Sequence, residues 1–123
     1  MKTLSPVDKF GKFIVENLRD RGIDFAEGLL KKHWKAPSLL EMQDEVTSLN
    51  DNQKAAFLKA VTQTIDSAIH DFLFALQEQA EFDNDIQILV EGQNIVELSD
   101  GIHGEAYSKE GWIAKYSSHK VDI

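Results

Sequence analysis

The stretch Asn50–Ala80, NDNQKAAFLKAVTQTIDSAIHDFLFALQEQA, decides the fold of this 123-residue chain. Asn50 is followed three residues later by Gln53, which is the spacing of a capping box that satisfies free backbone N–H groups at a helix start. Apolar side chains then recur at helical spacing, which predicts one long helix from about Asn50 to Ala80. They are Phe57, Leu58, Val61, Ile65, Ala68, Ile69, Phe72 and Leu76, with Lys59, Gln63, Asp66, His70 and Gln77 marking the opposite face.

The second half of this long helix is apolar on almost every side, because residues 72–76 read FLFAL. A helix segment of that kind needs cover on more than one side. We therefore expect the C-terminal third of the chain to pack against it, with Trp112 buried against Phe72 or Phe74. The alternative is that Trp112 and Tyr116 lie on an exposed face and anchor a partner.

Before the long helix, the clearest helix signal is Ser5 followed by Pro6. Serine accepts a free N–H group as an N-cap, and proline at the first helical position loses no hydrogen bond. Apolar residues follow at helical spacing, and Gly22 is typical of a C-terminal stop. These signals predict a first helix from about Pro6 to Arg21.

Two shorter helices are expected between residues 24 and 50. Asp24 can cap the first of them, which carries an apolar stripe as far as Trp34 and should end at the Ala36-Pro37 pair. Ser38 and Glu41 have the spacing of a capping box and predict the start of the next helix.

From Asp85 onward the apolar period changes from helical to strand-like, with Gly92 supplying a turn. The expected strands are Ile86–Val90, Ile95–Leu98, a short segment around Ala106–Tyr107, and Trp112–Tyr116. Helices followed by strands, without alternation, indicate an α+β fold. We expect a single domain over residues 1–123, in which N-terminal helices and one long central helix pack against a small C-terminal antiparallel β-meander.

Charge is segregated along the chain, whose formal net charge is −8. Residues 1–40 contain eight Lys or Arg against five Asp or Glu, whereas residues 41–100 contain two against thirteen. A one-sided negative field attracts basic proteins and repels nucleic-acid phosphates and anionic membranes. We therefore predict a surface that binds a basic protein, and no nucleic-acid or membrane partner. The predicted partner-binding residues are Glu78, Glu81, Asp83, Asp85, Glu91, Glu97 and Asp100. The simpler alternative is that this charge only keeps the protein soluble.

Composition and motifs exclude several classes of chemistry. The chain has no cysteine, which removes disulfides and thiolate chemistry and fits a reducing compartment, so we expect a cytoplasmic protein. It contains no apolar run long enough to span a bilayer. Phosphate loops, dinucleotide fingerprints and nucleophile elbows do not occur either, so we predict no cofactor and no catalytic residue.

Two histidines are candidates for the rim of a ligand site. Asp66 and His70 are neighbours on one helix face, where they could orient an imidazole or form half of a metal site. Their simpler interpretation is a surface pair, since a metal site usually needs three or four ligands, and we predict no metal. His103 lies between two glycines in a predicted turn, where the backbone can approach a ligand closely. With Trp112, these residues outline the possible rim.

Two segments, Asp66–Phe72 (DSAIHDF) and Ile95–Gly101 (IVELSDG), have the character of a family signature. In its small size, acidity, lack of cysteine and order of helices before a meander, the whole chain resembles the small immunity proteins of bacterial toxin systems. Those proteins neutralise a cognate toxin by covering its active site or a neighbouring surface. The resemblance implies a non-enzymatic interaction protein and carries no functional residue across. The alternatives are a small-molecule-binding or enzymatic domain with a pocket between the long helix and the sheet, and a structural module that forms a homodimer.

Overall fold

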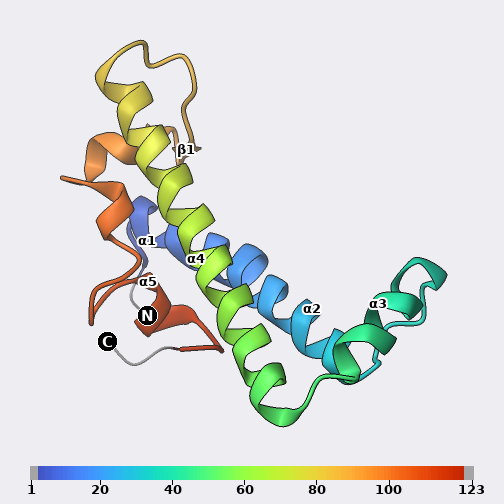
Figure 1. Cartoon of the computed structure of the whole chain (residues 1–123). Helices are drawn as coiled ribbons and strands as arrows, with labels where there is room; N and C mark the ends of the chain where they lie inside the picture. The colour runs from blue at the N-terminus through green and yellow to red at the C-terminus, as the bar shows by residue number, and fades with distance from the viewer. Residues whose placement is uncertain (1–2, 121–123) are drawn as a thin grey trace.

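The computed structural model describes residues 3–120, and it has an α+β fold in which two long helical stretches run past each other in opposite directions (Figure 1). After the longer stretch the chain turns back and packs alongside it, so the predicted fold class and long central helix are confirmed. The helices are α1 (Pro6–Ile14), the π-helical η1 (Val15–Arg19), α2 (Asp20–Leu30), α3 (Pro37–Thr47), α4 (Asp51–Glu81) and α5 (Trp112–Tyr116). The remaining elements are strands β1 (Leu89–Val90) and β2 (Gln93–Asn94) and the 3-10 helices η2 (Ile95–Leu98) and η3 (Ile102–Gly104).

The first helical stretch begins as predicted and continues further. The Ser5 side chain accepts a hydrogen bond from the Asp8 N–H at 3.2 Å, and Pro6 occupies the first turn. The expected stop at Gly22 is wrong, because α1, η1 and α2 follow one another without a break to Leu30. A Cβ atom on Gly22 would lie 2.7 Å from the Ile65 side chain, so this glycine allows α2 and α4 to approach closely. Asp24 accordingly lies inside a helix and caps none.

Trp34 does not extend the second helix, which ends at Leu30. The chain turns back, the Trp34 ring stacks on Phe25, and its indole N–H donates to the Phe25 carbonyl at 3.1 Å. Pro37 is the first residue of α3, and the N-cap is Ala36 without a side-chain bond, so the capping box predicted from Ser38 is wrong.

Helix α4 begins with the predicted capping box. The Asn50 side chain accepts from the Gln53 N–H at 2.8 Å, and the Gln53 side chain accepts from the Asn50 N–H at 2.9 Å. The predicted polar face is wrong in part, since Asp66 and Gln77 are half-buried under the C-terminal third while Phe72 is 47% exposed. Within residues 3–120, the C-terminal third therefore covers one side of this apolar helix end and leaves Phe72 on the other side half exposed.

The β-structure is smaller than the expected meander. Strands β1 and β2 form one antiparallel hairpin in which Leu89 pairs with Asn94. Its two turn residues, Glu91 and Gly92, both have positive φ, as the tight hairpin turn that matches the strand twist requires. Segment Ile95–Leu98 is a 3-10 helix, because the Asn94 side chain accepts from the Val96 N–H and starts a helical turn.

The last predicted strand, Trp112–Tyr116, is instead the short helix α5. Trp112 and Ile113 are consecutive and both buried, which one turn of helix allows and a strand with one exposed face does not. The Trp112 and Ile113 N–H groups donate to the carbonyls of Glu105 and Ala106. Segment Ala106–Tyr107 is therefore no strand, and its Ala106 carbonyl accepts a hydrogen bond from α5.

Trp112 is at the centre of the core, with none of its surface exposed. Its predicted burial is correct, but its neighbours are Phe10, whose ring meets it edge to face at 5.8 Å, and Gly11. The predicted contact with Phe72 or Phe74 is wrong, because both phenylalanines lie on the outer side of α4, about half exposed, and Phe74 meets His103 there. The apolar core around it comprises Val7, Ile14, Val15, Ile69, Leu73, Leu76, Ile95, Val96, Ile102, Ala106 and Ile113.

None of the helices within residues 3–120 combines the length and the apolar character that a membrane span requires.

Candidate functional site

A buried network centred on Arg19 joins three distant segments of the chain. The side chain has no exposed surface, and its Nε donates to Asp66 Oδ1 on α4 at 2.6 Å while Nη2 donates to Oδ2 at 3.3 Å. Nη1 donates to the Ser117 hydroxyl at 2.9 Å and to the His119 carbonyl at 2.7 Å. A guanidinium that meets a carboxylate with two bonds is held in a fixed orientation.

The π-helical turn η1 explains how Arg19 comes to face inward. A π turn holds one more residue than an α turn, which rotates the following helix by about 100°. Two consecutive charged residues, Arg19 and Asp20, are thereby both buried. Asp20 accepts bonds from the Ser117 hydroxyl and from the Ser118 N–H at 2.9 Å. Because each partner is satisfied within the protein, we assign this network a structural role.

The predicted ligand rim forms only in part. His70 and His103 come together, with ring centroids 5.5 Å apart, and His103 also meets Phe74 edge to face at 5.2 Å. Asp66 does not pair with His70, since its carboxylate binds Arg19, and His70 Nδ1 lies 3.5 Å from Asp71 instead. Trp112 is buried in the core and does not belong to the rim.

The surface beside these histidines is a shallow hollow of about 300 Å³, lined by Asp66, Ser67, His70, Asp71 and Tyr107. Nδ1 of His103 is buried and has no hydrogen-bond partner among the described residues. Sequence reasoning missed Tyr107, whose ring lies 6.1 Å from the His70 ring. No local signal could have placed it there, because Tyr107 follows Asp66, whose carbonyl it contacts, by 41 residues.

Tyr107 gives this hollow a testable property. Its hydroxyl donates to the Asp66 carbonyl at 2.6 Å, and burial, assisted by the nearby Asp66 carboxylate, raises the pKa of Tyr107 well above 10. An unfolded tyrosine loses its proton near pH 10, so the contribution of Tyr107 to stability is complete below pH 10 and is lost as the pH rises above it. We expect the free energy of unfolding to fall by up to about 1 kcal/mol more between pH 9 and pH 11 in wild type than in Tyr107→Phe, allowing for partial exposure.

Denaturant unfolding of both proteins at several pH values measures this difference. Tyr116→Phe is the matched control, since Tyr116 is half-buried on α5. Equal alkaline losses in wild type and Tyr107→Phe would contradict the assignment.

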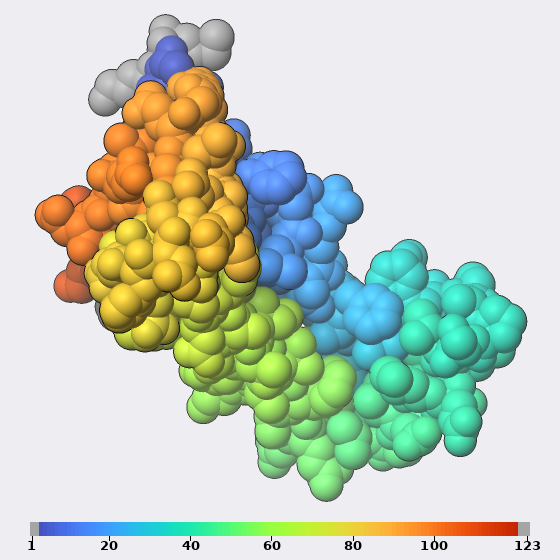
Figure 2. All heavy atoms as spheres, turned by 90° about the horizontal axis from the view of Figure 1, so that it is seen from above, coloured from blue at the N-terminus to red at the C-terminus, as the bar shows by residue number. Residues whose placement is uncertain are grey.

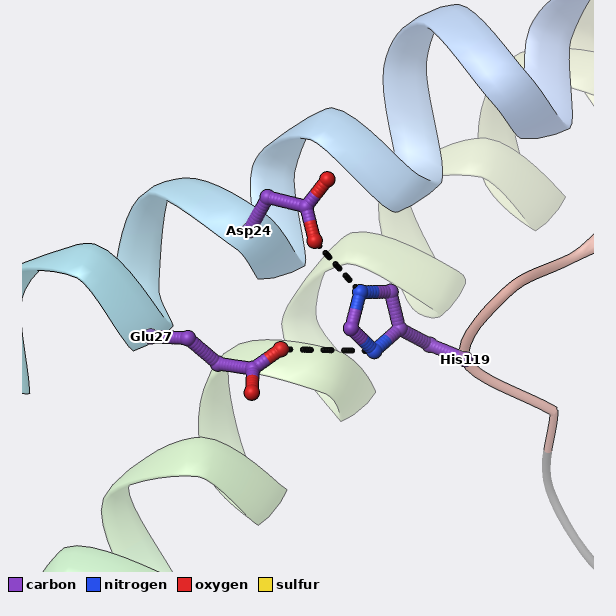
Figure 3. Close-up of side chains that lie close together, drawn as sticks. All are labelled: Asp24, Glu27 and His119. Carbon is purple, nitrogen blue, oxygen red and sulfur yellow. Dashed lines mark hydrogen bonds and ion pairs between the residues drawn. The ribbon is translucent and has the colours of Figure 1, made fainter.

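A second cluster, Asp24, Glu27 and His119, joins α2 to the segment after α5 (Figure 3). The His119 ring lies between the carboxylates, with Nε2 2.6 Å from Asp24 Oδ1 and Nδ1 3.4 Å from Glu27 Oε1. These ligand atoms lie within 4.8 Å of one another, so the three residues could hold a divalent cation. The two ring nitrogens face different carboxylates, however, so the ring bridges Asp24 and Glu27 and ties α2 to the segment after α5.

The predicted partner-binding carboxylates are brought together only in part. Glu78 on α4 and Asp83 beyond its end line one shallow hollow of about 480 Å³. Glu81 and Asp85, next to them in sequence, are exposed. Glu91 differs, because its carboxylate forms an ion pair with Lys9 of α1.

The last two predicted carboxylates, Glu97 on η2 and Asp100 after it, are exposed and line neither this hollow nor the one beside His70. In the view from above, the yellow and orange segments of about residues 80–100 form one continuous face beside blue α1 (Figure 2). Of the predicted carboxylates, Glu78 and Asp83 line a common hollow, and Glu81, Asp85, Glu97 and Asp100 are exposed on the segments around it.

Comparison of the chain with protein-family models, with curated proteins and with solved structures found no match.

Proposed function

We propose that this protein is a non-enzymatic interaction module that uses its acidic face to bind a basic protein, and that the partner is a toxin that it neutralises. The support comes from the exposure and the ion pairing of the predicted carboxylates within residues 3–120. Within residues 3–120, Glu78, Glu81, Asp83, Asp85, Glu97 and Asp100 are all exposed and none forms an ion pair with a Lys, Arg or His of that range. Their field is thus free to act on an approaching partner.

The proposal predicts that binding depends on charge at this face and on salt. A variant carrying Glu81→Lys, Asp83→Lys, Asp85→Lys and Glu97→Lys should lose a partner that wild type captures from a lysate of the source organism at physiological salt. Wild-type affinity should fall by about tenfold or more between low and high salt, mainly through slower association, because complementary charge steers encounter.

A matched variant controls for net charge. Glu16, Glu41, Glu45 and Glu110 are also exposed and lie elsewhere, so reversing these four gives the same net charge with the acidic face intact. This variant should retain the partner. Loss of the partner by both variants, or affinity unchanged by salt, would contradict a specific acidic binding face.

The second candidate is a small-molecule-binding domain, with the ligand in the hollow beside His70 and His103. The observation that favours it is that Nδ1 of His103 is buried without a hydrogen-bond partner among the described residues, while its ring contacts His70 in the wall of the hollow. Native mass spectrometry of freshly purified protein tests it: a retained ligand that is lost in His103→Ala would favour this candidate over the first.

A further inference from the structure

The hollow lined by Glu78 and Asp83, here called the acidic hollow, also has exposed apolar side chains in its lining, which form its floor. Phe72 of α4 and Phe82 and Ile86 of the following segment line it and are 47%, 79% and 61% exposed, respectively. Large apolar side chains gathered at one exposed place mark an interaction site far more often than the same side chains scattered singly. Glu78 and Asp83 lie in the lining of the same hollow.

The path of the chain explains why this floor stays open. The C-terminal third packs on the Leu73 and Leu76 side of α4 and leaves Phe72 outside. Helix α4 ends at Glu81, and Asn84, with a φ of 55°, reverses the chain so that Ile86 returns beside the helix that it has just left. Three apolar side chains from both sides of this reversal therefore face the same space.

We propose that the hollow seats a basic amphipathic segment of the partner protein, with an apolar side chain on Phe72, Phe82 and Ile86 and flanking Lys or Arg side chains against Glu78 and Asp83. This inference rests on the proposed function and adds to it the chemistry of the segment that is bound. A few anchoring side chains seated in well-packed pockets supply most of the binding energy in protein interfaces. Basic amphipathic helices are bound in hydrophobic grooves in this manner.

A second apolar hollow on the same protein provides the contrast. It lies between α1 and β1, has a volume of about 360 Å³, and is lined by Lys9, Phe10, Phe13, Ile88, Leu89 and Val90. Its only charged lining residue is a lysine, whereas those of the first hollow are two carboxylates. Because that lysine is already paired with Glu91, the second hollow offers a basic segment no carboxylate of its own, and charge complementarity selects the first.

The test uses a synthetic amphipathic helix of about 14 residues built from leucine and lysine, whose length gives four turns. Titration calorimetry against wild type, Phe82→Ser and Phe13→Ser measures its affinity. Phe13 is 66% exposed in the second hollow and is thus the matched control for an exposed phenylalanine. We expect Phe82→Ser to weaken binding by about tenfold and Phe13→Ser to leave it within about twofold.

A second peptide, with every leucine replaced by serine, keeps the charge and removes the anchor. It should bind wild type about tenfold more weakly than the leucine peptide. Equal affinity for both peptides, or equal losses in Phe82→Ser and Phe13→Ser, would overturn the apolar anchor. So would a wild-type dimer, seen by sedimentation, that Phe82→Ser converts to a monomer, since a second copy would then be the occupant.

The two proposals fail in different ways. If a basic partner is captured in a salt-dependent manner and Phe82→Ser retains it, the acidic interaction face stands and the anchor is overturned. If the four-site charge reversal leaves capture unchanged, the proposed function itself is overturned. Because Phe82 is so exposed, its variant should unfold at the same denaturant concentration as wild type, which excludes misfolding as the cause of lost binding.

Discussion

Replacing Arg19 with alanine is expected to lower the free energy of unfolding by about 3–5 kcal/mol. The guanidinium has no exposed surface, and its removal takes two hydrogen bonds from Asp66 and a nearby positive charge from buried Asp20. The Ser117 hydroxyl and the His119 carbonyl also lose their donor. Breaking a buried pair costs far more than an exposed one, because the remaining charge stays buried without compensation.

Urea unfolding at neutral pH, followed by circular dichroism, measures this effect. The matched control is Arg21→Ala, since Arg21 is exposed on the same helical stretch, and its change should stay within about 0.5 kcal/mol. Arg19→Lys keeps the charge but cannot reproduce the two-bond contact with Asp66, so it should fall between the two. If Arg19→Ala and Arg21→Ala had equal effects, the network would contribute nothing to stability.

Gly11→Ala is expected to destabilise the protein by about 3 kcal/mol or more, which is the upper end of the range for overpacking a core. A Cβ atom at this position would lie 2.3–2.4 Å from three atoms of the Trp112 indole. The ring cannot withdraw, because it is fully buried and packs against Phe10 on another side. Either α1 must move outward or the indole must leave its rotamer.

Thermal and urea unfolding of Gly11→Ala, with near-ultraviolet circular dichroism to follow the indole, measure this effect. Gly104→Ala is the control, since a Cβ atom there would meet nothing within 4 Å. It should change stability by less than about 0.5 kcal/mol. A Gly11→Ala variant as stable as the Gly104→Ala variant would show that α1 and α5 are not in the close contact described above.

Signals contained within a few residues predicted the structure well. The Ser5 cap depends on an N–H group three residues away, and the Asn50 capping box closes over the same distance. The length of α4 follows from a single apolar period, which neighbouring elements do not alter. The fold class followed from these local patterns.

The errors arose where the same residue type serves two purposes. A glycine can end a helix, or it can let a neighbouring helix pack closely against it. The pattern around Gly22 predicts a helix end, but the Ile65 side chain of α4 occupies the space beside this glycine. Which purpose applies depends on what lies opposite, and that is a tertiary property. The expected strand Trp112–Tyr116 failed for a similar reason, since its N–H groups bind carbonyls of the preceding turn and no neighbouring strand.

The sequence indicated the acidic segment that contributes to the candidate binding site. It did not indicate the exposed apolar side chains that line the hollow there. The floor exists because the chain reverses at Asn84, and a positive φ at an asparagine has no certain signature in sequence. Clusters built from distant residues were missed altogether. Asp24 and Glu27 have the spacing of neighbours on a helix, but nothing local indicates that His119 lies between them.

The Arg19 network also has a consequence for folding during synthesis. Ser117 and His119, which accept the remaining bonds of Arg19, follow it by 98 and 100 residues. While residues 117–119 are still inside the ribosome, α1, α2 and α4 can already meet, but the guanidinium between them is only partly satisfied. The nascent protein should therefore stay open around Arg19, exposed to chaperones and proteases, until the final residues of the network leave the exit tunnel.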